Sequence, residues 1–282
     1  MGAVTVAGGM QRAMQVPDLR RRLFFTLWMF FVFRLGAHVP VPGVDPRRIE
    51  ELFATGTLFA FLDVFAGGAL RAFSVFAMSI IPYINASIIM QLLTVVVPTF
   101  ERWAKEGYEG RKRLTQWTRY GTVVLALVQG LAVAFFLRSQ GALLSGGPAA
   151  LAVIVIALTA GTTFLMWLGE QITEKGIGNG ISLLVFAGIV SRLPAGLGNL
   201  VKLYEGGRIN AFNILVMIVL GLIVIAGVVW VQQGQRRIPV HYARRVVGRR
   251  VYGGQSTHIP IRVNQAGVIP VIFAASVLAF PT

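Results

Sequence analysis

The sequence of 282 residues contains no cysteine. That absence excludes a disulfide, a thiolate metal site and a cysteine nucleophile. Charged residues are also scarce, at 13% of the chain, whereas a soluble domain carries about 25%. Hydrophobic residues make up 55%. A water-soluble fold would need more charge on its surface, so the excess apolar residues are expected to face lipid.

Acidic residues are few, at 11 against 26 lysines and arginines, which leaves a net charge of +15. Of the 26 basic residues, 18 lie in four alternating stretches: 12–22, 102–119, Lys175 and 236–262. Cytoplasmic loops retain lysine and arginine, so this distribution predicts a membrane protein with a cytoplasmic N-terminus. A basic chain could instead bind nucleic acid. Most of this charge flanks apolar runs, however, where anionic lipid headgroups attract it.

Seven apolar runs are long enough, wholly or nearly, to cross the hydrocarbon core, which takes about 20 helical residues. They are Leu23–Val39, Phe73–Val97, Tyr120–Leu137, Ala149–Leu168, Ile181–Gly198, Ala211–Val231 and Ala266–Phe280. The apolar stretch Leu58–Leu70 is too short to span and contains Asp63. It is predicted to be a re-entrant or interfacial segment, with an amphipathic surface helix as the alternative.

The run Phe73–Val97 carries a polar stripe. Its polar residues recur every four positions, which places them on one face of a helix: Ser79, Tyr83, Ser87 and Gln91. Isoleucines run beside them: Ile80, Ile84 and Ile88. Pro82 removes a backbone hydrogen bond and is expected to bend this helix. The stripe either packs against another helix or borders an aqueous path.

A glycine-rich segment precedes the fifth run. No strand is predicted before Gly176–Gly180 and no Gly-Lys-Ser/Thr follows it, so it does not fit a nucleotide-binding fingerprint. We expect a tight cytoplasmic turn in which glycines adopt positive φ. Beyond it, Ile181 and Val185 are four residues apart and lie one above the other on a helix.

Residues 232–265 form the longest polar connection, with seven arginines and no acidic residue. Apolar residues alternate with others around Ile238 and Val240, and again from Ile259 to Val263, which predicts two short strands of a hairpin. Six arginines come as doublets: Arg236, Arg237, Arg244, Arg245, Arg249 and Arg250. The loop is predicted to bind a cytoplasmic partner, with a lipid-facing basic loop as the alternative.

Catalysis finds little support in the sequence. The three histidines, His38, His241 and His258, lie apart, and none has metal-ligand spacing with another. The sequence therefore predicts neither an enzyme nor a bound metal or cofactor.

Five segments, in order along the chain, resemble the SecY family, whose members form the central subunit of the bacterial protein-translocation channel. They are FRLGAHVPVPGVD (33–45), FAGGALRAFSVFAMSIIPYINASIIMQLLTVVVP (65–98), EGYEGRKRLTQWTRYGT (106–122), FLMWLGEQITEKGIGNGISLLVFAGIV (164–190) and RRIPVHYARRVVGRRVYGGQSTHIPIRVNQAGVIPVIFA (236–274). The resemblance extends over about residues 16–280.

The resemblance implies an all-α polytopic membrane fold, a ten-helix bundle of two inverted five-helix halves around an hourglass pore. Residues 1–22 would be a cytoplasmic N-terminus, and residues 23–198 the first half-bundle, with five transmembrane helices and a re-entrant plug at about 57–70. Residues 199–282 would begin the second half-bundle, with two helices flanking the basic loop 232–265. Because family members continue for three more helices, the chain is expected to be truncated.

The resemblance also implies residue roles. The pore constriction would consist of Ile80, Ile84, Ile181, Val185 and Ile272. The plug would include Leu58, Phe59, Phe61, Leu62, Phe65, Gly67 and Gly68. The lateral gate would be bordered by Ser79, Tyr83, Ser87 and Gln91. The arginine doublets would bind the ribosome or SecA.

By the same resemblance, the chain is expected to pass unfolded secretory polypeptides across the bacterial cytoplasmic membrane and to release signal and transmembrane segments into it. Expected partners are SecE, SecG, the SecA ATPase, the ribosome through its RNA, nascent signal sequences and anionic lipids. The alternative is a secondary transporter of a small solute, which would need a charged or cation-binding midplane site. A third possibility, an RNA-binding membrane anchor, would explain the basic loop but not the polar stripe.

Overall fold

The computed structural model describes residues 16–55, 68–144, 147–240, 245–247, 250–252 and 257–264. The chain divides into two compact units, Met1–Leu197 and Gly198–Thr282, and each is described by itself. Several predicted features lie outside the described residues: Leu58, Phe59, Phe61, Leu62, Phe65, Gly67, Arg244, Arg249, Ile272 and the run Ala266–Phe280.

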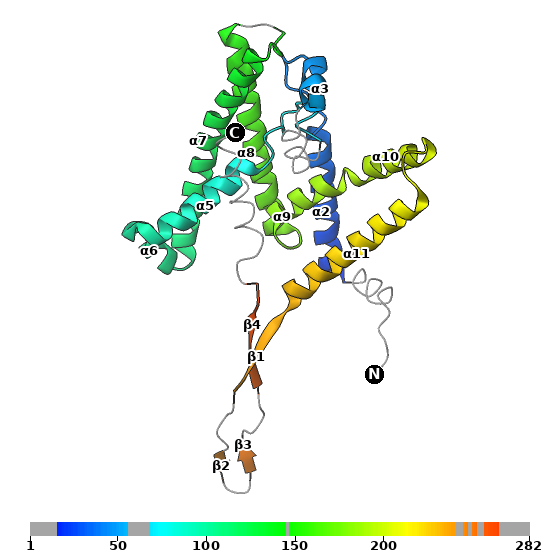
Figure 1. The fold of residues 1–282 in the computed structure, drawn as a ribbon. Helices are drawn as coiled ribbons and strands as arrows, with labels where there is room; N and C mark the ends of the chain where they lie inside the picture. Colours follow the sequence, from blue (N-terminus) through cyan, green and yellow to red (C-terminus); the bar gives the residue numbers. More distant parts are fainter. Residues whose placement is uncertain are drawn as a thin grey trace. The chain divides into compact units, whose positions relative to one another are not determined.

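The first unit is built from helices (Figure 1). They are α2 (Pro17–Gly36), α3 (Pro46–Thr55), α5 (Ile81–Val96), α6 (Pro98–Lys105), α7 (Tyr108–Ser139), α8 (Pro148–Lys175) and α9 (Gly180–Val190), and α10 (Leu193–Glu205) begins at the end of this unit. Helices α2, α5, α6 and α8 carry a proline in the first turn, where its fixed φ suits a helix and its missing N–H is not needed. Helix α8 is central, because it packs against α2, α7 and α9.

Several helices of the described residues are long and apolar enough to cross a membrane. They are α7, α8, the α9–α10 stretch Gly180–Glu205, and α11 (Ala211–Gln233); the pair α5 and α6, bent by 99°, would be a fifth span. These spans coincide with five of the predicted runs, which confirms a multi-pass helical membrane protein. Helix α2 contains most of the predicted run Leu23–Val39. Its five charged residues keep it out of this group of apolar spans.

The predicted run Phe73–Val97 is not one helix. Residues 68–80 form successive turns, and α5 begins only at Ile81. Ser79 therefore precedes the helix, with φ of 53°, so the prediction that it shares a helical face with the later polar residues was wrong. Pro82 lies in the first turn of α5, where it starts this helix instead of bending it.

The turn segment 68–80 is largely buried, and two of its backbone hydrogen bonds go to residues distant in the sequence. The Val75 N–H donates to the Val39 carbonyl at 3.0 Å, and the Val41 N–H donates to the Phe73 carbonyl at 3.0 Å. The ring of Phe76 stacks on Phe33. Non-helical backbone at membrane depth is stable only where protein surrounds it and pairs its polar groups. Together with hydrogen bonds inside the turns, such as that from the Ser74 N–H to the Ala69 carbonyl at 2.8 Å, these contacts replace the hydrogen bonds that a helix would have supplied.

Two hydrophobic clusters hold the first unit together. One packs residues 41–49 and 73–78 against α7 and α8. The other joins α2, α8 and α9 around residues 69–80. The turn segment contributes to both clusters, so it lies between the two halves of the core.

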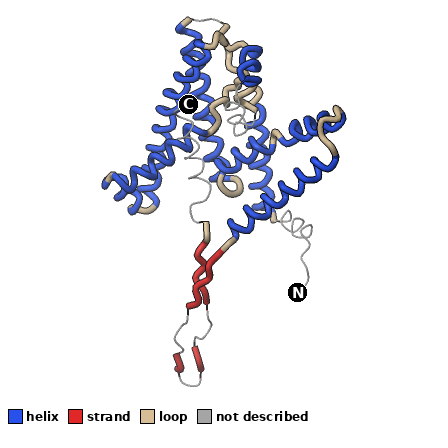
Figure 2. The backbone as a smooth tube through the Cα atoms, viewed as in Figure 1, coloured by secondary structure: helices blue, strands red, loops and turns tan. Residues whose placement is uncertain are grey.

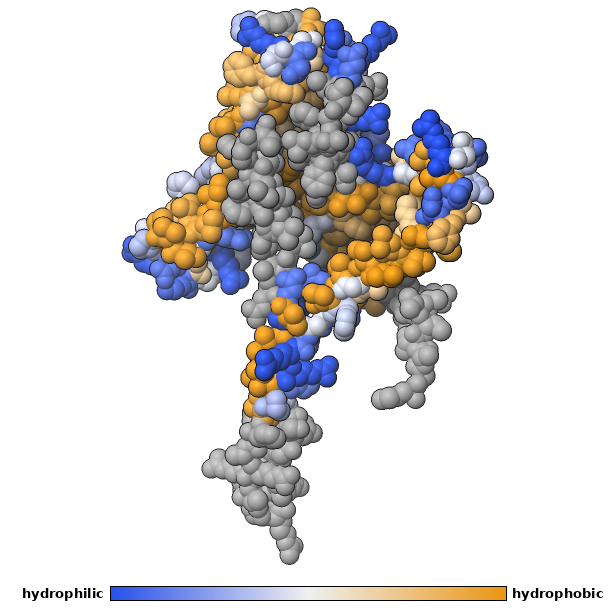
Figure 3. Space-filling model, viewed as in Figure 1, coloured by the Kyte–Doolittle hydropathy of each residue, from blue (hydrophilic) through white to orange (hydrophobic). Residues whose placement is uncertain are grey.

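The second unit contains α11 and a β-hairpin. Strand β1 (Gln235–Val240) pairs antiparallel with β4 (Thr257–Arg262), and β2 (Arg245–Val247) pairs with β3 (Arg250–Tyr252). Figure 2 shows these strands in red. The hairpin predicted from period-two alternation is confirmed. Helix α11 exposes nearly all of its apolar side chains, and its surface is hydrophobic in Figure 3, which suits a helix surrounded by lipid.

Candidate functional site

Two long-range hydrogen bonds mark the two ends of the first unit. At one end the Ile177 N–H donates to Thr26 Oγ1 at 3.3 Å, which joins the glycine turn to the basic end of α2. At the other end the Asp45 N–H donates to the Ala142 carbonyl at 2.9 Å. Segments predicted to be cytoplasmic thus meet one another, and so do segments predicted to be external. Which of the two ends is cytoplasmic stays a prediction.

Four of the five predicted constriction residues meet in one hydrophobic cluster. Ile80 is buried, and Ile84, Ile181 and Val185 are half-buried and pack against the same cluster. Residues of α2, α8 and α9 complete it: Phe33, Leu165, Leu168, Ile172 and Leu184. Ile272 lies outside the described residues. Aliphatic side chains from two separate parts of the chain therefore converge, and their role in a pore stays a prediction.

The glycine turn between α8 and α9 positions the second pair of these residues. Gly178 has φ of +69°, as predicted, whereas Gly176 and Gly180 serve close packing. A Cβ on Gly180 would lie 2.0 Å from the Gly169 carbonyl oxygen, and the Gly180 N–H donates to Thr173 Oγ1 at 2.8 Å. Side chains at these glycines would push α9 away from α8 and displace Ile181.

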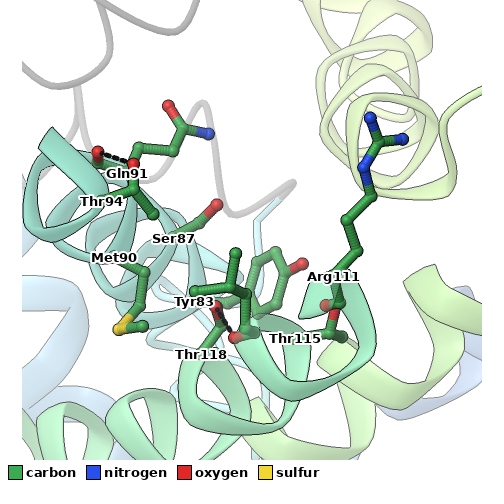
Figure 4. Close-up of a pocket in the computed structure, with 9 residues that line it drawn as sticks. Tyr83, Ser87, Met90, Gln91, Thr94, Arg111, Thr115 and Thr118 are labelled. Atoms are coloured by element: carbon green, nitrogen blue, oxygen red, sulfur yellow. Dashed lines mark hydrogen bonds between the residues drawn. The ribbon is translucent and has the colours of Figure 1, made fainter. Parts of the chain in front are cut away.

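The polar stripe of α5 faces the first turns of α7 across a pocket of about 300 Å³ (Figure 4). Its lining residues are Tyr83, Ser87, Met90, Gln91 and Thr94 from α5, with Arg111, Leu114, Thr115 and Thr118 from α7. The Thr115 hydroxyl donates to the Arg111 carbonyl at 3.0 Å, and the Thr118 hydroxyl donates to the Leu114 carbonyl at 2.9 Å. Their oxygens can still accept, so the pocket offers hydrogen-bond acceptors.

Sequence reasoning missed the α7 side of this pocket. Arg111, Thr115 and Thr118 follow one another at helical spacing, a signal comparable to the α5 stripe. The stripe therefore packs toward another helix, as one of the two alternatives predicted, while leaving a polar space. A lateral-gate role for Tyr83 and Gln91 stays a prediction.

An ion pair joins α7 to α8. Arg119 approaches Glu170 through Nε at 2.9 Å and through Nη2 at 2.8 Å, a two-point contact with the carboxylate. The two residues are 51 positions apart, so no local sequence pattern reveals this pair.

The β1–β4 hairpin divides its residues between two faces. Arg236 lies opposite Ile261 and Ile238 opposite Ile259, whereas Arg237 lies opposite Pro260. Successive strand residues point to opposite faces, so one doublet presents an arginine on each side. In the shorter strand pair, β2 and β3, Arg245 lies opposite Tyr252 and Arg250 lies opposite Val247.

The described residues hold no group of three or more His, Asp or Glu side chains suited to a metal ion.

Known proteins resemble this chain in both sequence and fold. A protein-family model described as SecY matches residues 74–282. The chain belongs to the SecY family. The family expected from the five sequence segments is therefore confirmed.

SecY proteins from distant bacteria are about half identical to the chain. The protein translocase subunit SecY of Pseudomonas aeruginosa is 50% identical over 268 residues, which cover 94% of this chain and 61% of that protein. That of Halalkalibacterium halodurans is 51% identical over 276 residues, covering 95% and 64% respectively. The Escherichia coli K12 protein is 48% identical, covering 94% and 61%. The chain thus spans less than two thirds of the length of these relatives.

Solved channel structures share the fold. A structure described as that of a protein conducting channel superposes with a TM-score of 0.63 at 21% identity, covering 92% of this chain and 56% of the other. A second structure, from work on the plug domain of the SecY protein, gives the same TM-score of 0.63 at 22% identity. These similarities confirm the SecY-type helix bundle, and the named relatives are translocase subunits, not secondary transporters.

Proposed function

We propose that this chain forms part of the pore subunit of a channel that passes unfolded secretory polypeptides across the bacterial cytoplasmic membrane. The observation that best supports this proposal is that Ile80 and Ile84 pack in one hydrophobic cluster with Ile181 and Val185. The names of the SecY relatives support the same function. Energy for transport would come from the ribosome or from the SecA ATPase.

A ring of aliphatic side chains suits this task physically. Dispersion contacts have no directional requirement, so such a ring can surround any passing sequence without binding it tightly. An empty hydrophobic constriction resists wetting and therefore blocks the passage of ions. The segment at about 57–70 would act as a plug and add a second seal.

Release of apolar segments would occur beside α5. Signal and transmembrane segments leave a wet pore for lipid because their apolar surface is removed from water there. The polar stripe of Tyr83, Ser87 and Gln91 would border this exit, and Ser79 would lie at its beginning. The pocket between α5 and α7 would leave the stripe room to rearrange when the exit opens.

The basic hairpin would project into the cytoplasm and bind the motor or the ribosome. Arginine pairs with phosphate or carboxylate through two parallel hydrogen bonds, and the doublet Arg236–Arg237 offers one guanidinium on each face of the ribbon. A cytoplasmic N-terminus, partner subunits SecE and SecG, and anionic lipids complete the proposed assembly.

The test uses the complete subunit with its partner subunits in lipid vesicles. We expect uptake of an unfolded secretory polypeptide when SecA and ATP are added. The double substitution Ile84→Asn with Ile181→Asn should raise resting ion conductance, because polar side chains let water into the constriction. Ile84→Val with Ile181→Val keeps the ring aliphatic and is the matched control. Absence of uptake, or equal conductance of both variants, would contradict the proposal.

A further inference from the structure

Helix α6 leaves α5 with a bend of 99° and is amphipathic. Its apolar side chains Phe100, Trp103 and Ala104 share one face. Charged side chains take the opposite face: Glu101, Arg102 and Lys105. Every residue of this helix is exposed or half-exposed, and around it Figure 3 shows hydrophobic residues edged by hydrophilic ones. A helix of this kind needs an environment that is apolar on one side and wet on the other.

Aromatic contacts fix which side of α7 this helix covers. Phe100 meets Trp103 edge-on at 5.2 Å and Trp117 at 6.1 Å, and Trp117 meets Tyr120 at 6.3 Å. Trp117 and Tyr120 begin a stripe of exposed large apolar residues on one face of α7: Trp117, Tyr120, Val124, Leu127, Val128, Leu131 and Phe135. The buried residues of α7 take the opposite face, except Gly110, which lies against Trp103 of α6. Helix α6 therefore lies over the outward side of the bundle.

The length of this stripe indicates how deep α6 lies in the membrane. From Trp117 to Phe135 a helix rises about 27 Å at about 1.5 Å per residue, and the hydrocarbon core is about 30 Å thick. Trp117 consequently lies at the boundary between hydrocarbon and headgroups, where tryptophan and tyrosine concentrate. Helix α6 packs on this residue and lies at the same level.

The charges around α6 indicate which lipids it meets. Residues 98–113 hold five basic and three acidic side chains. Glu101 pairs with Lys105, and Glu106 lies 3.9 Å from Arg113. The remaining basic excess would be attracted by an anionic headgroup layer.

We propose that α6 lies in the membrane plane, with Phe100 and Trp103 in a headgroup layer of anionic phospholipid. The charged face of α6 is turned to water. This contact fixes the adjoining end of α5 to the membrane surface. The inference stands independently of what the channel transports.

Spin labels can measure this immersion directly. Because the chain has no cysteine, Ala104→Cys and Lys105→Cys each give one labelling site. The two positions are about 100° apart on the helix, the first on its apolar side and the second on its charged side. The full chain is placed in vesicles of phosphatidylcholine and phosphatidylglycerol without any other protein, and collisions with oxygen and with a water-soluble nickel chelate are compared. We expect the label at position 104 about 5–10 Å into the headgroup boundary, and the label at position 105 in water.

Further variants separate the parts of the proposal. Phe100→Ser with Trp103→Ser should move the label at position 104 into water, whereas Thr99→Ser, at the border of the two faces, should leave it in place. Equal nickel access at positions 104 and 105 would overturn the membrane contact and favour a helix free to bind a soluble protein. Equal immersion in phosphatidylcholine alone would overturn the requirement for anionic lipid.

Discussion

Gly161 of α8 lies closely against the turn segment 68–80, and this contact makes Gly161→Ala an informative substitution. The new methyl would lie 1.8 Å from the Val75 carbonyl oxygen and 2.7 Å from its carbon. Val75 cannot yield easily, because its N–H is bonded to the Val39 carbonyl at 3.0 Å. Either α8 or the turn segment has to move.

The magnitude follows from comparison with Gly130→Ala in α7. There the new methyl would meet Val155 Cγ1 at 3.7 Å, an ordinary contact. Both substitutions gain about 1 kcal/mol of helix propensity, and only Gly161→Ala adds the overpacking cost of about 1–3 kcal/mol. A clash with backbone lies toward the upper end of that range. We expect Gly161→Ala to be less stable than Gly130→Ala by about 2–3 kcal/mol.

The assay is thermal unfolding of the purified chain in detergent at one fixed heating rate, since unfolding of membrane proteins is commonly irreversible. At about 2–4 °C per kcal/mol, the midpoint of Gly161→Ala should lie roughly 4–12 °C below that of Gly130→Ala. Equal midpoints would refute the close approach of α8 to residues 68–80, and with it the account of how that segment is held.

Two other predictions concern charges. Reversing Arg249 and Arg250 to Glu in the complete channel should preserve membrane insertion, because five arginines remain in the loop, but it should strongly reduce ribosome affinity or SecA-driven transport. Arg208→Glu is the control. If ribosome binding and transport both survive the double reversal, the loop is only a topological anchor. A double-mutant cycle of Arg119→Gln and Glu170→Gln should give a coupling of about 0.5–1 kcal/mol, because the side chains are 47% and 20% exposed. Zero coupling would mean that this pair does not stabilise the α7–α8 contact.

The hydrophobic runs and the hairpin were predictable because their signals are local. A run such as Ala149–Leu168 must be helical in lipid, since only a helix satisfies its own backbone there. Alternation around Ile238 and Ile259 has a period that only a strand presents on one face. The convergence of Ile84 with Ile181 came from the family resemblance, because residues far apart in sequence carry no common periodicity.

The features that sequence reasoning missed depend on contacts distant in the chain. Residues 73–80 are as apolar as the helix that follows, so composition could not distinguish buried turns from a longer helix. Two backbone hydrogen bonds of this segment, one with Val39 and one with Val41, join residues more than thirty positions apart. The ion pair of Arg119 with Glu170 likewise joins residues that are distant in the sequence. Pro98, by contrast, lies at the bend between α5 and α6. Because proline is common in the first turn of a helix, it could have been used to predict where α6 begins.

The two prolines of the hairpin have a consequence for the crowded membrane surface. In a ribbon of two strands both outer edges are open, and an open edge is a template for pairing with another chain. Pro239 lies in β1 and Pro260 in β4, and a proline is tolerated in such strands where its nitrogen faces away from the partner. Each edge thereby lacks one donor for a third strand. Neighbouring copies can project their hairpins side by side without joining them into a continuous sheet.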